Sequence, residues 1–233
     1  MAPRQRPFVQ VDVFTKVPYK GNALAVIQDA TDITSEDMAA FARWTNLAET
    51  TFLLPPTDRS VADYKVRIFT PEEELPFAGH PSLGSCEAWL QHGGKPRNAD
   101  YIVQECGIGL VKIRREASGK LALRAPPLKR SGPVEEEALK IACKAMNIPR
   151  KAVIAHQWIE NGPPWFGIEL GSAQEVLDVK PTALAGPSTF WGIVGKYPNL
   201  NEASTEENPL LEVRAFILSG GSIIEDPVTG SLK

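Results

Sequence analysis

Three ionisable side chains stand at points where the sequence changes from one kind of element to another. Glu49 follows a helical segment that stops near Asn46 and precedes the apolar stretch Thr50–Leu54. His80 follows Gly79 in a loop that leads into a helix, and Asp226 begins the last loop of the chain. A carboxylate that is partly desolvated at such a junction has a raised pKa, which suits a group that takes and returns a proton. An imidazole beside a helix start can donate to or accept from a bound carboxylate.

Each of these residues also has an ordinary structural interpretation. Taken alone, Glu49 has the pattern of a solvated loop glutamate. A single loop histidine such as His80 more often has a structural role. Asp226 precedes a proline, which is typical of a turn. The combination of the three residues, and not any one of them, therefore carries the prediction of a site.

Two loops of the chain resemble each other. Arg67-Ile68-Phe69 precedes the turn Pro76–Pro81, and Arg214-Ala215-Phe216 precedes the turn 225–231. Matched units predict a duplicated pair of lobes, 1–126 and 127–233, with both turns facing a shared cleft. Helix starts near Pro81 and Gly230 would offer backbone N–H groups to an anion there. The Pro126-Pro127 pair is the best candidate boundary.

Alternating strand and helix patterns surround these loops. Two helices are predicted in the first half, one capped by Thr34 or Ser35 and one that starts at Pro81 and closes at Gly93-Gly94. The second half has a predicted helix at about 134–146 and a short one that starts at Ser172. Predicted strands lie near residues 9–13, 23–27, 50–54, 64–68, 101–105, 110–114, 121–124, 152–159, 165–170, 189–195 and 211–217.

Composition limits the classes of function. The 25 basic and 28 acidic side chains give a net charge of −3 and form no basic stripe, which argues against a nucleic-acid partner. No apolar run reaches the ~20 residues that span a bilayer, so no membrane partner is expected. The three cysteines are far apart, which favours free thiols in a reducing cytoplasm over a disulfide or metal site.

Four segments together resemble the phenazine biosynthesis PhzF family over nearly the whole chain, from Val11 to Ser231. The segments are Gly21–Val26, Asn46–Phe52, Leu75–Pro81 and residues 225–231. The resemblance implies an α+β fold similar to diaminopimelate epimerase, with two pseudo-symmetric lobes. Each lobe would be a mixed sheet curled around a central helix, with the active site between the lobes.

The resemblance also implies the chemistry. Glu49 would be the general acid/base, His80 and Asp226 would line the pocket and assist, and Gly79, Gly230 and Ser231 would bind substrate. The implied protein is an isomerase without cofactor or metal, commonly a homodimer, that moves a proton on a small anionic cyclic carboxylic acid.

The residue types agree with this chemistry and leave one alternative open. Racemases of related fold carry a cysteine in each helix-start loop, and neither loop here has one, so cysteine-based two-base racemisation is excluded at these positions. The chain stops at Lys233, which suggests that the second lobe lacks its own central helix and needs cover from elsewhere. The alternative hypothesis is therefore a non-catalytic relative that acts as a binding or assembly module.

Overall fold

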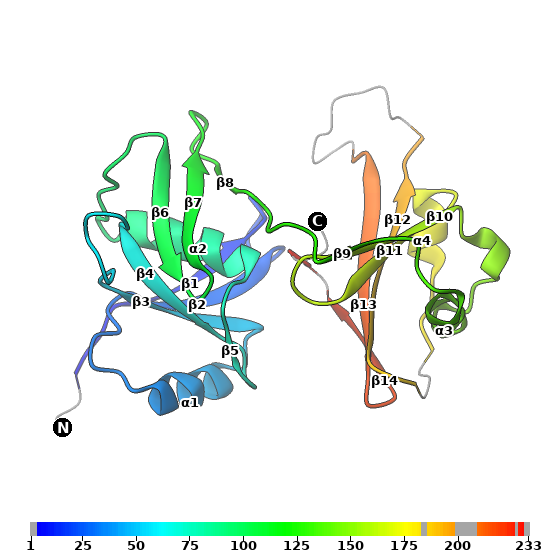
Figure 1. The fold of residues 1–233 in the computed structure, drawn as a ribbon, viewed down its shortest axis with the longest axis horizontal. Helices are drawn as coiled ribbons and strands as arrows, with labels where there is room; N and C mark the ends of the chain where they lie inside the picture. The colour runs from blue at the N-terminus through cyan, green and yellow to red at the C-terminus, as the bar shows by residue number, and fades with distance from the viewer. Residues whose placement is uncertain (1–3, 183–185, 199–208, 227, 231–233) are drawn as a thin grey trace. The chain divides into compact units, whose positions relative to one another are not determined.

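The computed structural model of the chain describes residues 4–182, 186–198, 209–226 and 228–230. It divides into two compact units, Met1–Ala125 and Pro126–Lys233 (Figure 1). The described residues form an 8-stranded sheet in the first unit and a 6-stranded sheet in the second. Both sheets mix parallel and antiparallel pairs, and helices pack on them. The α+β fold class predicted from the sequence is confirmed.

The sheet of the first unit has the strand order β1-β2-β3-β4-β6-β7-β8, with β5 paired to β4 alone. Its β2–β3 and β4–β6 pairs are parallel, and each of these crossovers carries a helix. The strands are β1 (Phe8–Val13), β2 (Asn22–Ile27), β3 (Glu49–Leu54), β4 (Tyr64–Phe69), β5 (Glu74–Leu75), β6 (Tyr101–Cys106), β7 (Gly109–Arg115) and β8 (Leu121–Leu123).

Two helices cover opposite faces of this sheet. Helix α1 (Ser35–Thr45) is capped by the Thr34 side chain, which accepts from the backbone N–H of Asp37. It packs against Phe52, whereas α2 (Gly79–Gln91) packs on the face that carries Leu53. Neighbouring side chains of a strand point to opposite faces, so these two contacts place the helices on the two sides. Both helices match the sequence prediction.

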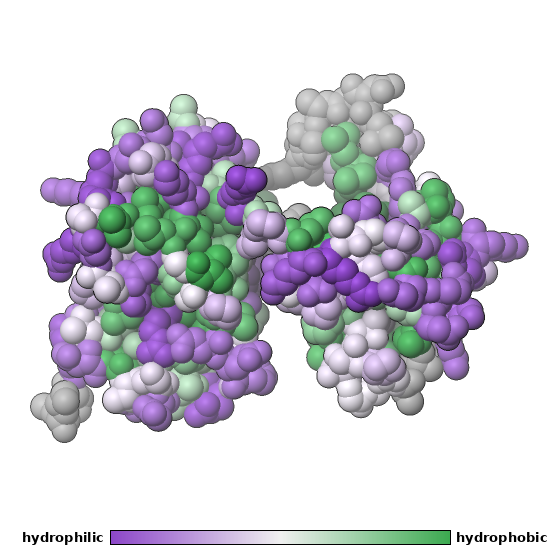
Figure 2. Space-filling model, in the orientation of Figure 1, coloured by the Kyte–Doolittle hydropathy of each residue, from purple (hydrophilic) through white to green (hydrophobic). Residues whose placement is uncertain are grey.

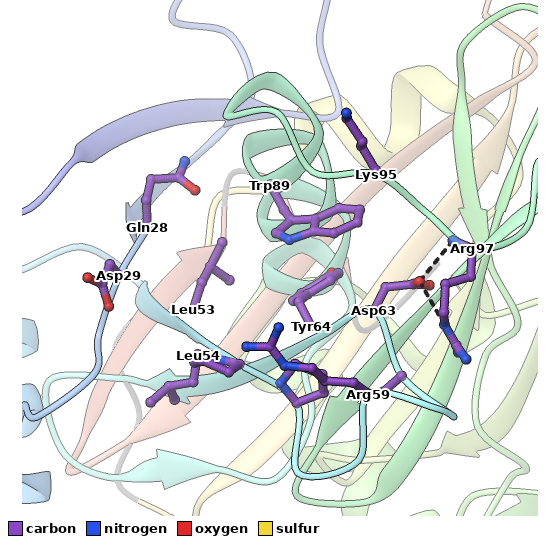
Figure 3. Close-up of a pocket in the computed structure, with 13 residues that line it drawn as sticks. Gln28, Asp29, Leu53, Leu54, Arg59, Asp63, Tyr64, Trp89, Lys95 and Arg97 are labelled. Carbon is purple, nitrogen blue, oxygen red and sulfur yellow. Dashed lines mark hydrogen bonds and ion pairs between the residues drawn. The ribbon is translucent and has the colours of Figure 1, made fainter.

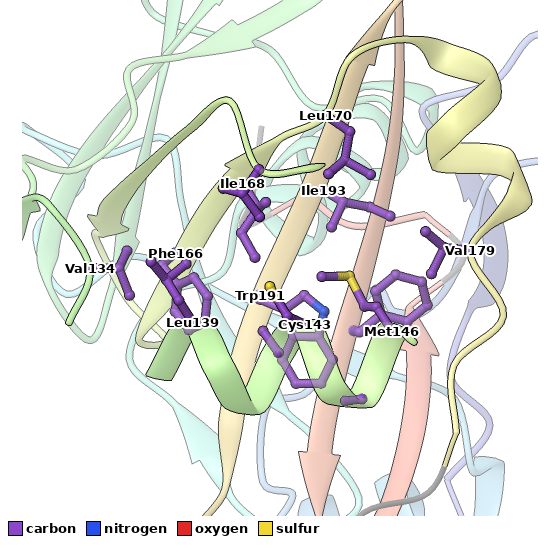
Figure 4. Close-up of a cluster of buried hydrophobic side chains, with 14 of the residues drawn as sticks. Val134, Leu139, Cys143, Met146, Phe166, Ile168, Leu170, Val179, Trp191 and Ile193 are labelled. Atoms are coloured by element: carbon purple, nitrogen blue, oxygen red, sulfur yellow. The ribbon is translucent and has the colours of Figure 1, made fainter. Parts of the chain in front are cut away.

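The second unit has the strand order β14-β13-β12-β11-β10-β9, and its β11–β12 pair is parallel. Helix α3 (Glu136–Met146) lies across the face of the sheet that carries Phe166, Ile168 and Trp191 (Figure 4). The other elements are β9 (Arg130–Gly132), a 3₁₀ turn (Arg150–Ala152), β10 (Ala155–Glu160), β11 (Trp165–Glu169), α4 (Ala173–Asp178), β12 (Thr189–Lys196), β13 (Leu211–Ser219) and β14 (Ser222–Asp226).

The two similar loops come after the same kind of hairpin in each unit. Phe69 of β4 pairs with Glu74 of β5, and Phe216 of β13 pairs with Glu225 of β14. In each hairpin the arginine two residues before the phenylalanine binds the glutamate with two N–H groups, at 2.7 and 2.5 Å for Arg67 and at 2.7 and 2.9 Å for Arg214. The sequence likeness therefore reflects a repeated structural unit.

The segment after the hairpin is described in full in the first unit only. There the loop after β5 leads into α2 at Gly79. In the second unit the structure describes residues 228–230 of the loop after β14. Pro227 and Ser231 lie outside the described residues, and so does the helix predicted to start near Gly230.

Some apolar side chains remain on the surface. Figure 2 shows hydrophobic residues gathered over β6 and β7 on the face in view, where Ile108 and Leu110 are more than half exposed. Within the part of the chain that the structure describes, no helix is long and apolar enough to cross a membrane. Among the same residues, no group of three or more His, Cys, Asp or Glu side chains is placed to hold a metal ion.

Candidate active site

Glu49 is the first residue of β3 and stands opposite Leu24 of β2 in the parallel ladder. Helix α1 ends at Asn46, whose left-handed backbone turns the chain toward the strand. The side chain of Glu49 is only 16% exposed. The helix-to-strand junction thus places a carboxylate at the end of a buried strand, as the sequence indicates.

His80 is the second residue of α2, and a buried polar network fixes the start of that helix. The Tyr64 hydroxyl donates to Gln104 Oε1 at 2.9 Å, and Gln104 Nε2 donates to Ser82 Oγ at 2.9 Å. Ser82 in turn donates to the carbonyl oxygen of Ala78, the residue that precedes the helix, at 2.8 Å. These bonds hold the first turn of α2, and with it His80, against the sheet.

Glu49 and His80 meet inside the first unit. His80 Nε2 lies 3.2 Å from Glu49 Oε2, and the histidine side chain is 6% exposed. At this distance the imidazole and the carboxylate are in direct contact. Burial lowers the pKa of His80 to about 4. The imidazole is therefore neutral near pH 7, and the pair holds no fixed positive charge.

The threonines next to Glu49 have a structural role. Ser85 of α2 donates to Thr51 Oγ1 at 2.8 Å, and Thr50 Oγ1 lies 2.9 Å from the hydroxyl of Thr45. Thr50 and Thr51 are both fully buried. These hydroxyls join β3 to the two helices that flank it, and they stabilise the position of the carboxylate.

A loop after β1 forms one wall of the site. The ring of Phe14 stands edge-on to the imidazole of His80 with 6.4 Å between their centroids. Phe14 has a φ of 68°, a backbone region that a bulky side chain rarely adopts. Gly21 at the far end of the loop lies so close to β1 that a Cβ there would be 2.1 Å from the carbonyl oxygen of Val13. The glycine in the Gly21-Asn22 motif is therefore needed for this close approach.

The other predicted residues lie in the second unit. Asp226 ends β14, and its Oδ1 accepts from the backbone N–H of Val228 at 3.1 Å, which makes a tight turn. Gly230 is half-buried in the bend after this turn, and Ser231 lies outside the described residues. Thr229 is 4% exposed, and its hydroxyl has no hydrogen-bond partner among the described residues.

The structure thus brings Glu49, His80 and Gly79 together in one unit, and it places Asp226 and Gly230 in the other. Phe14 was not a candidate from the sequence, and Thr229 was predicted only as part of the Thr-Gly-Ser segment that resembles a helix start able to hold an anion. No residue pattern singles out Phe14, since its role depends on a loop conformation. Thr229 stands in a Thr-Gly-Ser sequence that already indicates a polar loop, which was the available signal.

Comparison with known proteins identifies the family of the chain. The family model for phenazine biosynthesis-like proteins matches residues 11–233. The chain belongs to this family. Antisense-enhancing sequence 1 of Schizosaccharomyces pombe is 38% identical over 97% of this chain and 77% of that protein. The trans-2,3-dihydro-3-hydroxyanthranilate isomerase of Pseudomonas fluorescens is 40% identical over 49% of this chain and 40% of that protein.

A solved structure supports the fold of this PhzF-like chain. The crystal structure of a PhzF-family protein from Bacillus anthracis matches with a TM-score of 0.76 at 21% identity. The match covers 96% of this chain and 75% of that one. The resemblance stated from the sequence motifs is therefore confirmed for both family and fold.

Proposed function

We propose that this chain is an isomerase that moves a proton on a small cyclic carboxylic acid, with Glu49 as the group that carries the proton. The observation that supports this most is the buried contact between Glu49 and a neutral His80. The contact sets a carboxylate among buried side chains, next to an uncharged group that can donate or accept a hydrogen bond. The name of the Pseudomonas fluorescens relative supports the substrate class.

The proton shift needs only one acid/base group. A C–H bond breaks at one carbon, the double bond moves, and a C–H bond forms at another carbon of the same ring. The formula and the oxidation state stay the same, so no hydride or electron is consumed. Glu49 can take the proton as a carboxylate and return it as a carboxylic acid.

His80 suits the role of a neutral partner. An uncharged imidazole offers one N–H donor and one acceptor, and it can hydrogen-bond to Glu49 or to a substrate carboxylate in either protonation state of Glu49. A protonated imidazole would instead favour the charged carboxylate and weaken it as a base. Burial of His80 keeps its imidazole neutral, which is the form that this role needs.

Gly79, next to His80, is proposed to bind substrate. Asp226 is proposed to assist catalysis, and Gly230 and Ser231 are proposed to bind substrate. Their support is the sequence resemblance and the hairpin of β13 and β14, which repeats that of β4 and β5. The cytoplasmic location and the homodimer stay predictions.

Incorporation of solvent deuterium tests the proposal. The protein is incubated in D₂O with trans-2,3-dihydro-3-hydroxyanthranilate, and the ring product is analysed by mass spectrometry and NMR. The proposal predicts an isomer of the substrate in which a new C–H position carries deuterium to the extent that the Glu49 proton exchanges with solvent. If the folded protein forms no isomer of this acid or of related cyclic carboxylic acids, the proposed activity is wrong.

A further inference from the structure

A cavity lies in the first unit, at the other end of β3 from Glu49. Its volume is about 400 Å³, and its lining includes Leu53 and Pro56 (Figure 3). Glu49 is the first residue of β3 and Leu53 is the fifth, and strands rise by ~3.3 Å per residue, so the two residues are roughly 13 Å apart. The cavity shares no residue with the Glu49–His80 pair.

The free charges of this cavity are positive. It is lined by three cations and two carboxylates. Asp63 accepts from the backbone and the side chain of Arg97, and Asp29 accepts from Arg4. Within the described part of the chain, no hydrogen bond or ion pair is found for the other two cations, Arg59 and Lys95. The cavity therefore offers two unneutralised cations, in a chain whose net charge is −3.

Uncharged residues of the cavity provide an aromatic surface and a hydrogen-bond acceptor. The ring of Trp89 stacks on Tyr64 with 5.3 Å between centroids and 24° between planes, and Gly94 leaves room for the indole. In Figure 3 the nitrogen edge of this indole faces the side of Leu53 and Tyr64. Gln28 donates to the carbonyl oxygen of Ala88 at 3.2 Å, whereas its Oε1 is buried without a partner among the described residues. A buried acceptor without a donor is costly, and a ligand N–H or O–H would remove that cost.

We propose that this cavity is a second binding site, separate from the active site, for a small organic anion with a flat apolar body. The anionic oxygens would pair with Arg59, and the body would rest on Leu53, Pro56 and the edge of Trp89. Lys95, which lies on the other side of the Trp89 ring in Figure 3, would add positive charge. A donor group of the ligand would reach Gln28 Oε1. A carboxylate and a phosphate share the anionic chemistry that the two cations recognise.

The test uses benzoate and phenyl phosphate as probes and methyl benzoate as their neutral counterpart, which like the two anions carries no hydrogen-bond donor. The indole N–H signals of the five tryptophans are observed by NMR in the full chain, and Trp89→Phe identifies the signal of Trp89. A saturable shift of that signal is expected with one or both anions, at a Kd on the order of 1 mM for so small a ligand. Methyl benzoate should bind at least ~10-fold more weakly, because it lacks the charge.

The charge requirement is tested with matched variants. Arg59→Gln combined with Lys95→Gln should weaken anion binding by at least ~10-fold, because each substitution removes a charged hydrogen-bond donor. Arg43→Gln is the control, since Arg43 is an exposed cation of the same unit outside the cavity. Both cations of the double variant are exposed, so folding should survive, which a thermal melt verifies.

The outcomes separate the ligand classes. Tighter binding of phenyl phosphate assigns the site to phosphate esters, and tighter binding of benzoate assigns it to carboxylates. The proposal is overturned if neither anion shifts the Trp89 signal, if methyl benzoate binds as tightly, or if the double variant binds as the wild type does. Glu49→Gln should leave this binding unchanged, so the result stands apart from the proposed isomerase activity.

Discussion

Nε2 of His80 in α2 lies 3.2 Å from Oε2 of Glu49 in β3, although the two residues come from different elements of the first unit. The Ser85–Thr51 bond joins the same helix to the same strand, so the contact is held by the packing of the unit itself. The geometry of this acid/base pair is therefore a property of the first unit. Perturbations of its helix or strand should act on the pair directly.

Acid should destabilise the protein through His80. Its pKa is lowered by burial from 6.5 to about 4, so between these values the unfolded chain binds a proton that the folded chain does not. Stability is then highest above pH 6.5 and falls as the pH is lowered toward 4. The contribution of this group amounts to roughly 3 kcal/mol over that range. Urea unfolding of the wild type and of His80→Gln at several pH values measures it.

The difference in the free energy of unfolding between the wild type and His80→Gln reports on the histidine, because the other titrating groups are present in both proteins. The stability of the wild type relative to His80→Gln should decrease as the pH falls from 7 to 4. Parallel pH dependences of the two proteins would show that His80 titrates normally.

Arg67 and Arg214, which occupy equivalent positions in the two hairpins, should each stabilise the unit that contains them. The side chains of Arg67 and Arg214 are 23% and 17% exposed, and each binds a glutamate with two N–H groups. Because these contacts are partly shielded and bidentate, Arg67→Met and Arg214→Met should each cost about 1 to 2 kcal/mol in chemical unfolding. Arg114→Met is the control, since Arg114 is 70% exposed beside Glu116 and should change stability by less than ~0.5 kcal/mol. Equal effects of all three substitutions would refute this view of the hairpins.

The polar network below α2 should be sensitive to the loss of Gln104. Gln104→Leu removes the acceptor of the Tyr64 hydroxyl and the donor to Ser82, and it should cost about 1 to 3 kcal/mol. Adding Tyr64→Phe should recover part of that loss, because no buried hydroxyl is then left without an acceptor. Gln91→Leu is the control, since Gln91 is exposed and donates to the neighbouring Glu87. Additive losses in the double variant would contradict the network.

Thr229 should matter for binding and not for stability. Its buried hydroxyl has no partner among the described residues, so Thr229→Val should change the free energy of unfolding by less than ~0.5 kcal/mol. If this hydroxyl binds substrate, KM should rise by about tenfold while kcat stays similar. Thr51→Val is the contrast, since that hydroxyl is bonded to Ser85 and its loss should cost about 1 kcal/mol. An unchanged KM in Thr229→Val would remove Thr229 from the site.

Much of the fold follows from local patterns. The capping of α1 by Thr34, the helix start before Pro81 and the alternating strands are all set by short-range chemistry, and each was predicted close to its observed bounds. The hairpin between β13 and β14 was missed, although Gly220 and Gly221 have positive φ values and join Ser219 to Ser222 directly. Two glycines between strands are a hairpin signal, and it was hidden by the short, half-exposed β14.

The sequence selected the candidate residues of the proposed site but did not indicate their contacts. Glu49 and His80 were selected because each stands next to the end of an element, but their 3.2 Å contact depends on how α2 packs on β3. The lowered pKa of His80 is likewise a result of burial, which no single loop sequence specifies. Phe14 joins the site only through its left-handed backbone, a conformation that its residue type does not indicate.

The most direct measurement of the central claim is the turnover of trans-2,3-dihydro-3-hydroxyanthranilate by Glu49→Gln. This variant keeps the size and most contacts of the side chain but cannot carry the proton, so kcat should fall by ~10²–10⁴-fold with an unchanged thermal melt. Glu73→Gln, at an exposed position in the loop before β5, should retain wild-type turnover. Turnover by the folded Glu49→Gln variant near the wild-type rate would contradict Glu49 as the proton carrier.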